Sequence, residues 1–598
     1  MSDFLCQVPP TSAPQDGLRA LQDLFQPEQR SGWSRRTSSH SLAAVRDLIG
    51  PIPNWRESGD LVVAWIGDLP GIPRILEAAT RECLALIQDN PGSAESIATA
   101  LARGQLHDHF DGSGVVVLST AHWLAVLTDP MAGVQVYVGR DPAGKVRAVG
   151  SHADLVADAA GRSDQIDLVS VGDYLDTGTP CCPFTVYEGV TELEPGHVLV
   201  ITREADAKAS WWTPPREEPS IKLDEAAEAF VTSWRSAVER RCSGNRIAVQ
   251  LSGGMDSRAV MAAIPKSIAC AGLTFGDEIN REAKISALVA ASYGREWKFL
   301  KRDPEYLAKT AAFATRFTGC EGEWHHAHAI GLLPEFRDRG FSDVFTGLFM
   351  DNNFKGYYAD DIVSVQHARG WLPPTFRRRP MDYVAATSPW SRATLLPQIQ
   401  EARTARRRAF YERHFAKGRQ SEWEWLDGHP VSQASDNTGW FVERRLIPLR
   451  LPVYDRALVD LAFRVPALKK AGGQFFGAAL TRLLGPSGSI PNANDGSRPA
   501  SSPGVQHVQR LVRKAQRMVR DRLESIGLRG TVQHSWHDYR HYWNTSPIMR
   551  ELIREHRGRL AQFASCAHPG ALERALEDTS LPWRVSYRLL QLCLWTAQ

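Results

Sequence analysis

One short stretch, residues 247–264, constrains the fold of this chain more than any other part of its 598 residues. Residues 247–251 form an apolar run that predicts a buried strand. Gly253 and Gly254 then permit a tight turn, and residues 255–264 predict a helix. Such a turn directs backbone N–H groups and the positive end of the helix toward one point. The stretch therefore predicts an anion-binding site at the end of a strand.

The polar side chains around this turn favour a polyphosphate as the anion. Ser252 and Ser257 add hydroxyl donors, and Asp256 can hold a magnesium ion against phosphate oxygens. The turn has no lysine, unlike the longer P-loop, so the backbone and the metal must neutralise the charge. The pattern S-G-G-x-D-S is the pyrophosphate-loop motif of enzymes that convert a carboxylate into an adenylate with ATP. A short Gly-Gly turn also arises by chance, so the surrounding pattern has to decide.

The surrounding pattern is an alternation of strands and helices, which predicts an α/β fold with a parallel sheet. The predicted strands are residues 247–251, 268–275, 297–300 and 343–346, and the predicted helices are residues 255–264, 281–293 and 304–316. The second strand ends at a Gly-Asp pair, and a doubly wound sheet binds its ligand at such carboxyl ends. Residues 1–215 are instead mainly short strands with turns between them, one of them at 134–138. Paired tryptophans and prolines at 211–215 suggest a linker, so we expect one domain at 1–215 and a second at 216–598.

Composition and charge exclude several classes of function. A net charge of +3 lacks the basic field that nucleic-acid binding needs, so we expect no nucleic acid as a partner. An arginine-rich run at 403–408 predicts a solvated helix face, with binding of an acidic peptide as the alternative. We find no signal peptide and no run of about 18 apolar residues, so we expect no membrane contact and a cytoplasmic enzyme. The nine cysteines lack CxxC or Cys/His zinc spacings, and we expect reduced thiols.

Several further blocks occur in an order that a known family shares. Residues 129–137 (DPMAGVQVY) resemble the pattern R-D-x-x-G-x-x-P-L-Y-Y, and residues 190–197 (VTELEPGH) resemble G-V-x-x-L-x-P-G. Residues 346–351 (TGLFMD), with Gly356 and Tyr357, resemble S-G-E-G-x-D-E-x-x-G-G-Y, and residues 450–455 (RLPVYD) resemble R-x-P-F-L-D. With the glycine turn, these blocks resemble the asparagine synthetase B superfamily. The length and the departures from its pattern are most similar to lasso peptide cyclases.

The resemblance implies a fold and a set of site residues. The fold is an N-terminal glutaminase-like (Ntn-type) α/β sandwich domain and a C-terminal doubly wound pyrophosphate-loop synthetase domain with a helical extension. The residues implied to hold the β- and γ-phosphates of ATP are Ser252, Gly253, Gly254 and Ser257. The residues implied to seat adenosine are Leu251, Thr274, Phe275, Thr346 and Gly347. Asp256 and Asp351 would carry Mg²⁺, although Asp351 could instead be an ordinary helix N-cap.

Departures from the family pattern indicate where the nitrogen comes from. A working glutaminase of this family needs cysteine directly after the initiator methionine, but position 2 is Ser2 and the nearest thiol, Cys6, is internal. Residues 65–68 (WIGD) replace the N-G-E stretch that binds glutamine. We therefore expect no glutamine hydrolysis and an amine that the substrate itself carries. Leu348 stands where the synthetases have glutamate, which favours a bulkier, less polar acyl partner than free aspartate.

The attacking amine needs a modest base, and residues 321–328 (EGEWHHAH) offer candidates. We favour Glu321 and His326 as catalytic residues; the alternative is that these side chains cap or line a core helix. A zinc site is disfavoured, because adjacent His325 and His326 would point in different directions on a helix. The synthetases also carry a lysine near the C-terminal loop. Residues 490–498 contain none, so Arg498 or Asn494 would have to replace it.

Together these features predict an ATP-dependent, AMP-forming amide ligase with ATP and Mg²⁺ as cofactors. The resemblance implies a lasso peptide cyclase, which adenylates an Asp or Glu side chain of a leader-cleaved peptide and closes a macrolactam with the peptide's N-terminal amine. It also implies a precursor core peptide as substrate, with a leader-binding protein and a leader peptidase as partners. The alternatives are an asparagine synthetase- or β-lactam synthetase-like ligase acting on a small molecule, and an ATP-binding scaffold without catalysis.

Overall fold

The computed structural model describes most of the chain. The described residues are 3–10, 15–25, 30–46, 54–88, 92–244, 246–355, 388–414, 438–470, 473–501, 534–578 and 581–596, with scattered positions between 505 and 519. Gly356 and Tyr357, which belong to one of the family blocks, lie outside these residues.

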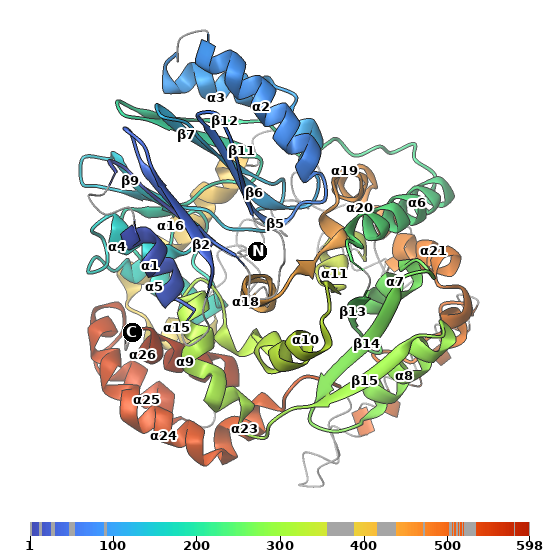
Figure 1. Cartoon of the computed structure of the whole chain (residues 1–598). Helices are drawn as coiled ribbons and strands as arrows, with labels where there is room; N and C mark the ends of the chain where they lie inside the picture. Colours follow the sequence, from blue (N-terminus) through green and yellow to red (C-terminus); the bar gives the residue numbers. More distant parts are fainter. Residues whose placement is uncertain are drawn as a thin grey trace.

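The N-terminal part contains two six-stranded antiparallel sheets that lie face to face (Figure 1). The first has the order β10-β8-β9-β1-β3-β2 and the second the order β12-β11-β7-β6-β5-β4. Their strands are β1 (Asp3–Gln7), β2 (Gly32–Arg36), β3 (Ser41–Val45), β4 (Trp55–Ser58), β5 (Leu61–Asp68), β6 (Ser113–Ser119), β7 (Trp123–Thr128), β8 (Tyr137–Arg140), β9 (Val146–Gly150), β10 (Val190–Glu192), β11 (His197–Thr202) and β12 (Asp206–Ser210). The helices of this part are α1 (Gln15–Asp23), α2 (Ile72–Gln88), α3 (Ala94–Arg103), η1 (Leu106–His109), α4 (Ala153–Ala159) and α5 (Leu168–Thr177).

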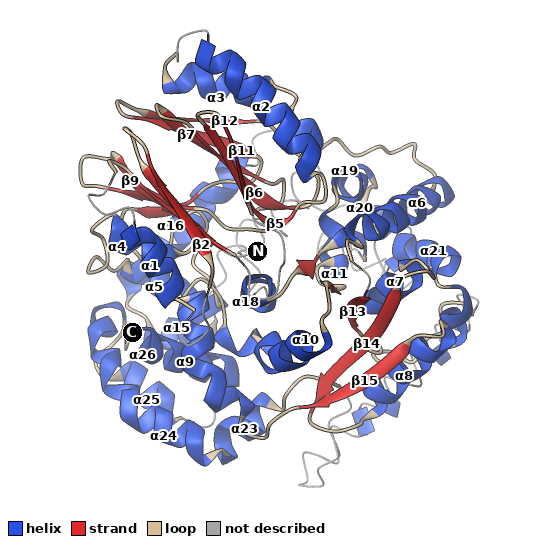
Figure 2. Cartoon of the chain, viewed as in Figure 1, coloured by secondary structure: helices blue, strands red, loops and turns tan. Residues whose placement is uncertain are grey.

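Helices cover the outer faces of both sheets, which gives four layers (Figure 2). Strand β5 shows why its residues suit the middle of such a sandwich. Leu61 and Val63 pack in the cluster that α2 and α3 complete, whereas Ala64 and Ile66 pack between the two sheets. Successive side chains of a strand point to opposite faces, and both faces of β5 are buried, so the strand is apolar until Asp68 at its end.

The C-terminal part is built on a five-stranded parallel sheet with the order β15-β14-β13-β16-β17. Its strands are β13 (Arg246–Gln250), β14 (Ala269–Gly276), β15 (Glu296–Lys301), β16 (Asp343–Phe345) and β17 (Leu449–Arg450). The helices between them are α7 (Met255–Ala263), α8 (Arg281–Ser292), α9 (Tyr306–Thr318), η2 (Trp324–His326), η3 (His328–Leu332), α10 (Leu333–Arg339) and α11 (Met350–Phe354), and α6 (Leu223–Arg241) precedes the sheet. The predicted α/β class and parallel sheet are confirmed.

The strand order creates a topological switch point between β13 and β16. The chain runs outward from β13 to β14 and β15, then returns to add β16 on the other side of β13. Ligands of doubly wound sheets bind at the carboxyl ends of the strands where the order reverses. The glycine turn follows β13, and residues 346–351 follow β16, so both predicted site segments leave the sheet at this point.

The remaining C-terminal elements are helical. They are α15 (Pro389–Thr394), α16 (Pro397–His414), α18 (Thr438–Leu446), η6 (Pro452–Tyr454), α19 (Arg456–Arg464), α20 (Ala467–Lys470), α21 (Gln474–Leu483), η8 (Gly485–Ser489), α23 (Tyr539–Thr545), α24 (Pro547–His556), η9 (Arg557–Cys566), α25 (Ala571–Glu577) and α26 (Trp583–Trp595). Within the part of the chain that the structure describes, no helix has both the length and the apolar character to cross a bilayer.

The arginine-rich run on α16 corrects one prediction. Arg403 is 2% exposed and pairs with Asp173 and Asp176 on α5, and Arg406 pairs with Asp167 at the start of that helix. The run therefore docks one helix onto another instead of forming a solvated face. Arg407 also pairs with Asp173, and the carboxylates of α5 offset the charge of these three arginines.

One predicted strand begins later in the structure, and one strand of the structure was not predicted. The strand expected at 134–138 begins instead at Tyr137, because Asp129 organises the preceding residues into a turn by accepting hydrogen bonds from the backbone of Met131 and Gly133. The fifth parallel strand, β17, was not predicted; only two residues pair with β16, which is too short a run for a periodicity to appear.

Helix α18 lies between the N-terminal sheets and the parallel sheet (Figure 1). Its Arg445 donates to both carboxylate oxygens of Asp3 on β1 and to the carbonyl of Ser151. A second buried pair joins Asp68 at the end of β5 to Arg241 on α6, at 2.5 Å. The two halves therefore share buried ion pairs, and the boundary expected between residues 215 and 216 stays a prediction.

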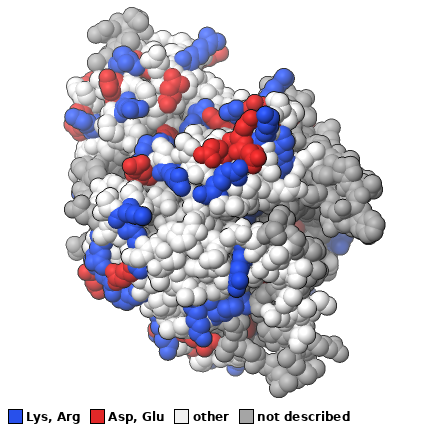
Figure 3. Space-filling model, turned by 90° about the vertical axis from the view of Figure 1, so that its right-hand side faces the viewer, with Lys and Arg blue, Asp and Glu red and all other residues white. Residues whose placement is uncertain are grey.

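Basic and acidic side chains lie interspersed on the face shown in Figure 3. This mixture agrees with the net charge of +3.

Candidate active site

The glycine turn after β13 is held by its two serine side chains. The Ser252 backbone N–H donates to Ser257 Oγ at 3.0 Å, and the two hydroxyl oxygens lie 3.0 Å apart. The Gly254 N–H donates to Ser252 Oγ at 3.2 Å. Gly254 occupies the N-cap position of α7 and offers no side-chain cap, so the first N–H groups of that helix stay available to a ligand. The turn is thus a preformed cradle for an anion.

A second loop closes over the turn from the C-terminal side. The Ala493 N–H donates to the Gly253 carbonyl at 3.0 Å, and a Cβ on Gly253 would approach Ala493 Cβ to 2.5 Å. Buried Arg258 on α7 fixes this loop, because its guanidinium donates to the carbonyls of Ile490 and Pro491 as well as to Gly253. Glycine is required at position 253 because the two loops touch through their backbones.

The loop also carries the two residues expected to replace the family's lysine. Asn494 is exposed, and its Nδ2 lies 4.0 Å from the position that a Cβ on Gly254 would take. Arg498 is exposed too, and its backbone N–H donates to Gln509. Asn494 therefore lies beside the turn, whereas nothing described draws the Arg498 side chain there.

The two predicted metal ligands meet at a single cation. Lys355 Nζ donates to Asp256 Oδ2 at 2.7 Å and also contacts Asp351 Oδ1. Asp256 lies in the first turn of α7 and Asp351 in the first turn of α11, one helix turn before Lys355. Residues that are 95 positions apart in the chain therefore place their carboxylates around one point.

Close packing of the two loops brings the aspartates together. A Cβ on Gly347 would lie 2.7 Å from the Asp256 carbonyl carbon and 2.7 Å from the Ser257 nitrogen. Any larger residue at position 347 would force the segment after β16 away from the start of α7. The glycine of the T-G-L-F-M-D block is thus needed for distance, not for backbone freedom.

The donor set fits a hard divalent cation. Asp256 Oδ1 is buried without a hydrogen-bond partner, and the Asp351 side chain is 53% exposed. Carboxylate oxygens are the ligands that Mg²⁺ prefers, and Mg²⁺ keeps several of its waters, which an open Asp351 allows. The ammonium of Lys355 stands at present where such an ion would balance the two negative charges.

Burial and the neighbouring charges shift the ionisation of this pair. Burial, opposed by Lys355 and reinforced by Asp351, raises the pKa of Asp256 to about 6. The pKa of Lys355 is raised, because the two carboxylates outweigh the effect of its own burial. Asp256 is therefore protonated at a higher pH than an ordinary aspartate, and a bound cation would need its ionised form.

The residue before α11 has an unusual backbone. Phe349 has a φ of 65°, in the left-handed region, and its ring stacks on Tyr454 with centroids 5.4 Å apart and planes at 8°. The family pattern has glycine at this position, which adopts such a φ without strain. Phe349 also occupies the N-cap position of α11, so the alternative that Asp351 is the N-cap is wrong.

The residues expected to seat adenosine are partly engaged in local bonds. Buried Thr274 donates through Oγ1 to the Leu251 carbonyl at 2.7 Å and accepts from the Trp297 indole. Thr346 Oγ1 accepts from the Leu348 N–H at 3.3 Å. Leu251, Thr274 and Thr346 all lie at the carboxyl ends of β13, β14 and β16. The structure thus gathers these residues at one edge of the sheet, and their contact with adenosine stays a prediction.

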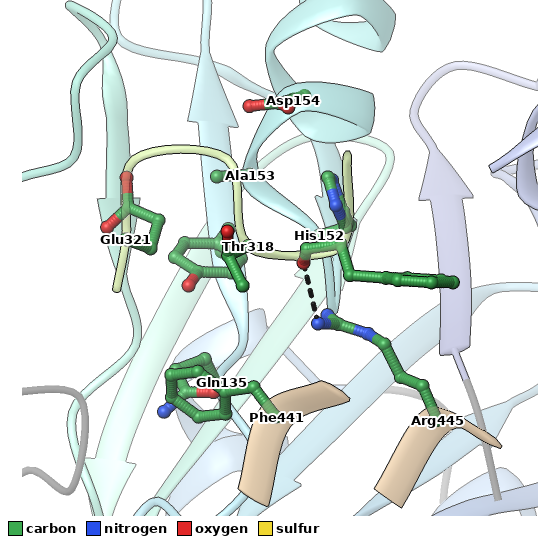
Figure 4. Close-up of a pocket in the computed structure, with 10 residues that line it drawn as sticks. Gln135, His152, Ala153, Asp154, Thr318, Glu321, Phe441 and Arg445 are labelled. Carbon is green, nitrogen blue, oxygen red and sulfur yellow. Dashed lines mark hydrogen bonds between the residues drawn. The ribbon is translucent and has the colours of Figure 1, made fainter. Parts of the chain in front are cut away.

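Glu321 lies in a different place from the glycine turn. It lines a small cavity of about 10 Å³, enough for roughly one water molecule, between the N-terminal half and α18 (Figure 4). Its Oε1 accepts from the Val186 N–H at 3.3 Å, and burial raises its pKa well above the ordinary value. None of the contacts described for Glu321 is with the turn, so its catalytic role remains a prediction without geometric support.

His326 belongs to a buried cluster on η2. Its Nε2 lies 3.6 Å from Glu323 Oε2, and its ring centroid lies 4.3 Å from that of His325. The expectation that adjacent His325 and His326 point apart is wrong, because residues 324–326 form a tight 3₁₀ turn instead of an α-helix. The following residues contact Tyr306, whose ring packs on Phe275 at the end of β14. Tyr306 therefore connects the segment that follows this cluster to the carboxyl end of β14.

Sequence reasoning missed Lys355. It stands where the family pattern S-G-E-G-x-D-E-x-x-G-G-Y has the first glycine of its closing G-G-Y, four residues after Asp351. An aspartate and a lysine four apart on a helix form a pair often enough that this spacing could have signalled it. The contact of Lys355 with Asp256 could not be inferred from spacing, because the two residues are far apart in the chain.

The chain matches a protein family model, and chains of solved structures match it at low sequence identity. Residues 233–484 match the family described as asparagine synthase, and this range includes the turn and both aspartates. No curated protein matches the chain. The chain is 13% identical to glutamine phosphoribosylpyrophosphate amidotransferase from B. subtilis complexed with ADP and GMP, over 50% of this chain and 65% of that chain, with a TM-score of 0.22. It is 12% identical to an allosteric regulatory enzyme of purine biosynthesis, over 50% of this chain and 80% of that one, with a TM-score of 0.23.

Proposed function

Because residues 233–484 belong to the asparagine synthase family, we propose that the chain is an ATP-dependent, AMP-forming amide ligase. One observation carries the proposal: Asp256 and Asp351 converge on a single cation beside a preformed glycine turn, at the switch point of a parallel sheet. A polyphosphate needs both features, since the turn supplies N–H donors and the carboxylates supply a metal.

Each residue of the site has a role in the first step. A substrate carboxylate oxygen attacks the α-phosphorus of ATP, and pyrophosphate leaves. The turn from Ser252 to Ser257 holds the β- and γ-phosphates through N–H and hydroxyl donors, and Arg258 keeps the covering loop in place. Asp256 and Asp351 would hold Mg²⁺, which offsets the charge that builds on the departing pyrophosphate.

The second step needs an amine held against the activated acyl carbon. The amine nitrogen attacks, AMP leaves, and one proton is released. An N-terminal amine has a pKa of about 8, so positioning contributes more than a strong base. Closure of the 490–498 loop over the turn would keep water from the acyl adenylate.

Two features of the N-terminal half support a nitrogen source other than glutamine. Cys6 is fully buried inside β1, and burial raises the pKa of its thiol, so it cannot act as a nucleophile. Asp68, which ends the stretch replacing the glutamine-binding residues, is fully buried and binds Arg241 and Arg450. Cys6 thus packs in the N-terminal core, and Asp68 joins the two halves of the molecule.

We propose further that the amine belongs to the same molecule as the carboxylate, as in lasso peptide cyclases. Leu348 and Phe349 replace the polar pair Glu-Gly of the synthetase pattern beside Asp351, which favours an acyl partner larger than free aspartate. The substrate would then be a leader-cleaved core peptide, and a leader-binding protein and a leader peptidase would supply it.

Product analysis tests both levels of the proposal. The full chain is incubated with Mg²⁺, ATP and either a leader-cleaved peptide carrying an internal Asp or Glu, or free aspartate with ammonium. AMP and pyrophosphate, with a peptide lighter by one water, support the cyclase. AMP formed only with the small molecule supports a small-molecule ligase and overturns the cyclase. Nucleotide binding without AMP in any mixture overturns the ligase itself.

A further inference from the structure

Three side chains that the nucleotide site does not use converge at η2: Glu323, His325 and His326. One ligand atom from each lies within 4.8 Å of the others. Within this group, His326 Nε2 and Glu323 Oε2 are 3.6 Å apart. Ligand atoms of a tetrahedral ion with bonds of about 2.0–2.1 Å lie about 3.3 Å apart, so rotations that move the ring nitrogens by about 1 Å would complete the site.

The cluster is buried with its polar atoms unmet. His325 and His326 are 1% and 4% exposed, and Glu323 is fully buried. Within the part of the chain that the structure describes, neither ring nitrogen of either histidine has a hydrogen-bond partner, and Glu323 Oε2 has none either. A buried polar atom without a partner costs about 1–3 kcal/mol, so several at one point call for a ligand that accepts their lone pairs.

The surroundings resemble those of a bound metal ion. Arg588 on α26 donates through Nε to Glu323 Oε1 at 2.7 Å, which orients the carboxylate and leaves Oε2 turned toward His326. The His325 ring packs against Tyr539, Trp583 and Tyr587. These aromatic rings surround His325 and exclude water from it.

We propose that Glu323, His325 and His326 bind one divalent transition-metal ion, with Zn²⁺ as the best match. Two imidazoles and one carboxylate are typical zinc ligands, and three protein ligands leave a fourth position for water or another ligand. This site differs in chemistry from the Asp256–Asp351 pair, whose oxygen-only ligands suit Mg²⁺.

The charges nearby allow an ion at this point. Besides Arg588, the Arg584 guanidinium lies 3.9 Å from Glu323 Oε2, but its side chain is 47% exposed and can turn toward solvent. His328 is the nearest further imidazole, with its ring centroid 6.3 Å from that of His326. Trp536, which is 44% exposed, packs on both His326 and His328 and separates that side of the cluster from solvent.

Metal retention by the full chain tests the proposal. The protein is stripped with a chelator, incubated with Zn²⁺ in the presence of excess Mg²⁺ to occupy the aspartate pair, passed through a desalting column and analysed for zinc. We expect about one equivalent in the wild type, and a loss of at least about tenfold in His326→Ala, because metal sites depend on each ligand. His328→Ala is the matched control and should keep its zinc, as should Asp351→Asn.

A second measurement decides the question if the His326→Ala chain does not fold. The wild type is loaded with Co²⁺, which gives intense visible absorption in a tetrahedral site and weak absorption in water. Such bands, removed by added Zn²⁺ but not by Mg²⁺, support the site. A wild-type chain that retains no zinc and shows no cobalt bands overturns the proposal, as does equal zinc retention in a folded His326→Ala variant.

Discussion

Replacing Lys355 with methionine tests how the two aspartates are balanced. The ammonium lies 2.7 Å from Asp256 Oδ2 and contacts Asp351, in the place that a metal ion would take. An ion arriving at the site must therefore displace it. Lys355→Met keeps the length of the side chain and removes the competing charge, so Mg²⁺ should bind more tightly in the variant.

The expected magnitude follows from the distance and the exposure. Two unit charges 2.7 Å apart attract by about 6 kcal/mol at an effective dielectric constant of about 20. The Lys355 side chain is 28% exposed and that of Asp256 22%, so solvent reduces the net value to about 1 kcal/mol. Removing this competition should lower the Kd for Mg²⁺ about fivefold.

Calorimetric titration with Mg²⁺ in the absence of nucleotide measures the effect. The titration is done near pH 8.5, because loss of the neighbouring cation raises the pKa of Asp256 further above about 6. At this pH Asp256 stays ionised in the variant. Lys309→Met is the matched control, since its ammonium pairs with exposed Asp303 at 2.6 Å, and it should leave Mg²⁺ binding unchanged. A Kd that is unchanged or larger in Lys355→Met would refute the reasoning that this lysine occupies the metal position.

Four other predictions follow from the same contacts. Asp256→Asn should lower the rate of AMP formation at least about a hundredfold in a pyrophosphate-release assay, because it removes a metal ligand while keeping the side-chain shape. In the wild type, Mg²⁺ affinity should fall about tenfold per pH unit below pH 6, where Asp256 becomes protonated, and should be flat above it; an unchanged affinity at pH 5 would contradict the pKa of about 6. The free energy of unfolding in urea should be about 1 kcal/mol larger for Phe349→Gly than for Phe349→Ala. Both variants lose the stack on Tyr454, but only glycine adopts a φ of 65° without strain. Equal stability would show that the backbone is not strained. Burial raises the pKa of Glu321, so the folded state binds its proton more strongly and loses stability as pH rises above the unfolded pKa of about 4.3. The melting temperature of Glu321→Gln relative to that of the wild type should therefore increase from pH 4 to pH 8. A constant difference would contradict this.

The sequence by itself determined the local parts of the site. The strand before residue 252, the glycine turn and the helix from Met255 are encoded within one continuous segment, residues 246–263, so periodicity and turn chemistry are sufficient to predict them. The alternation of strands and helices also predicted the parallel sheet, because a strand followed by a helix returns to the same sheet in the same direction. The glycine-turn motif pointed to Asp256, and the resemblance of residues 346–351 to the family pattern implied Asp351 as the second metal ligand.

Only the tertiary structure decided which distant side chains meet. Lys355 reaches Asp256 because Gly347 lets two loops approach closely, and this depends on packing between elements that follow different strands. A 3₁₀ turn brings His325 and His326 together, whereas the sequence pattern suggested an α-helix. Glu321, chosen for its chemistry, packs against Val186 between the two halves. Residue type and spacing describe what a side chain can do, but burial and contact across the fold decide where it does so.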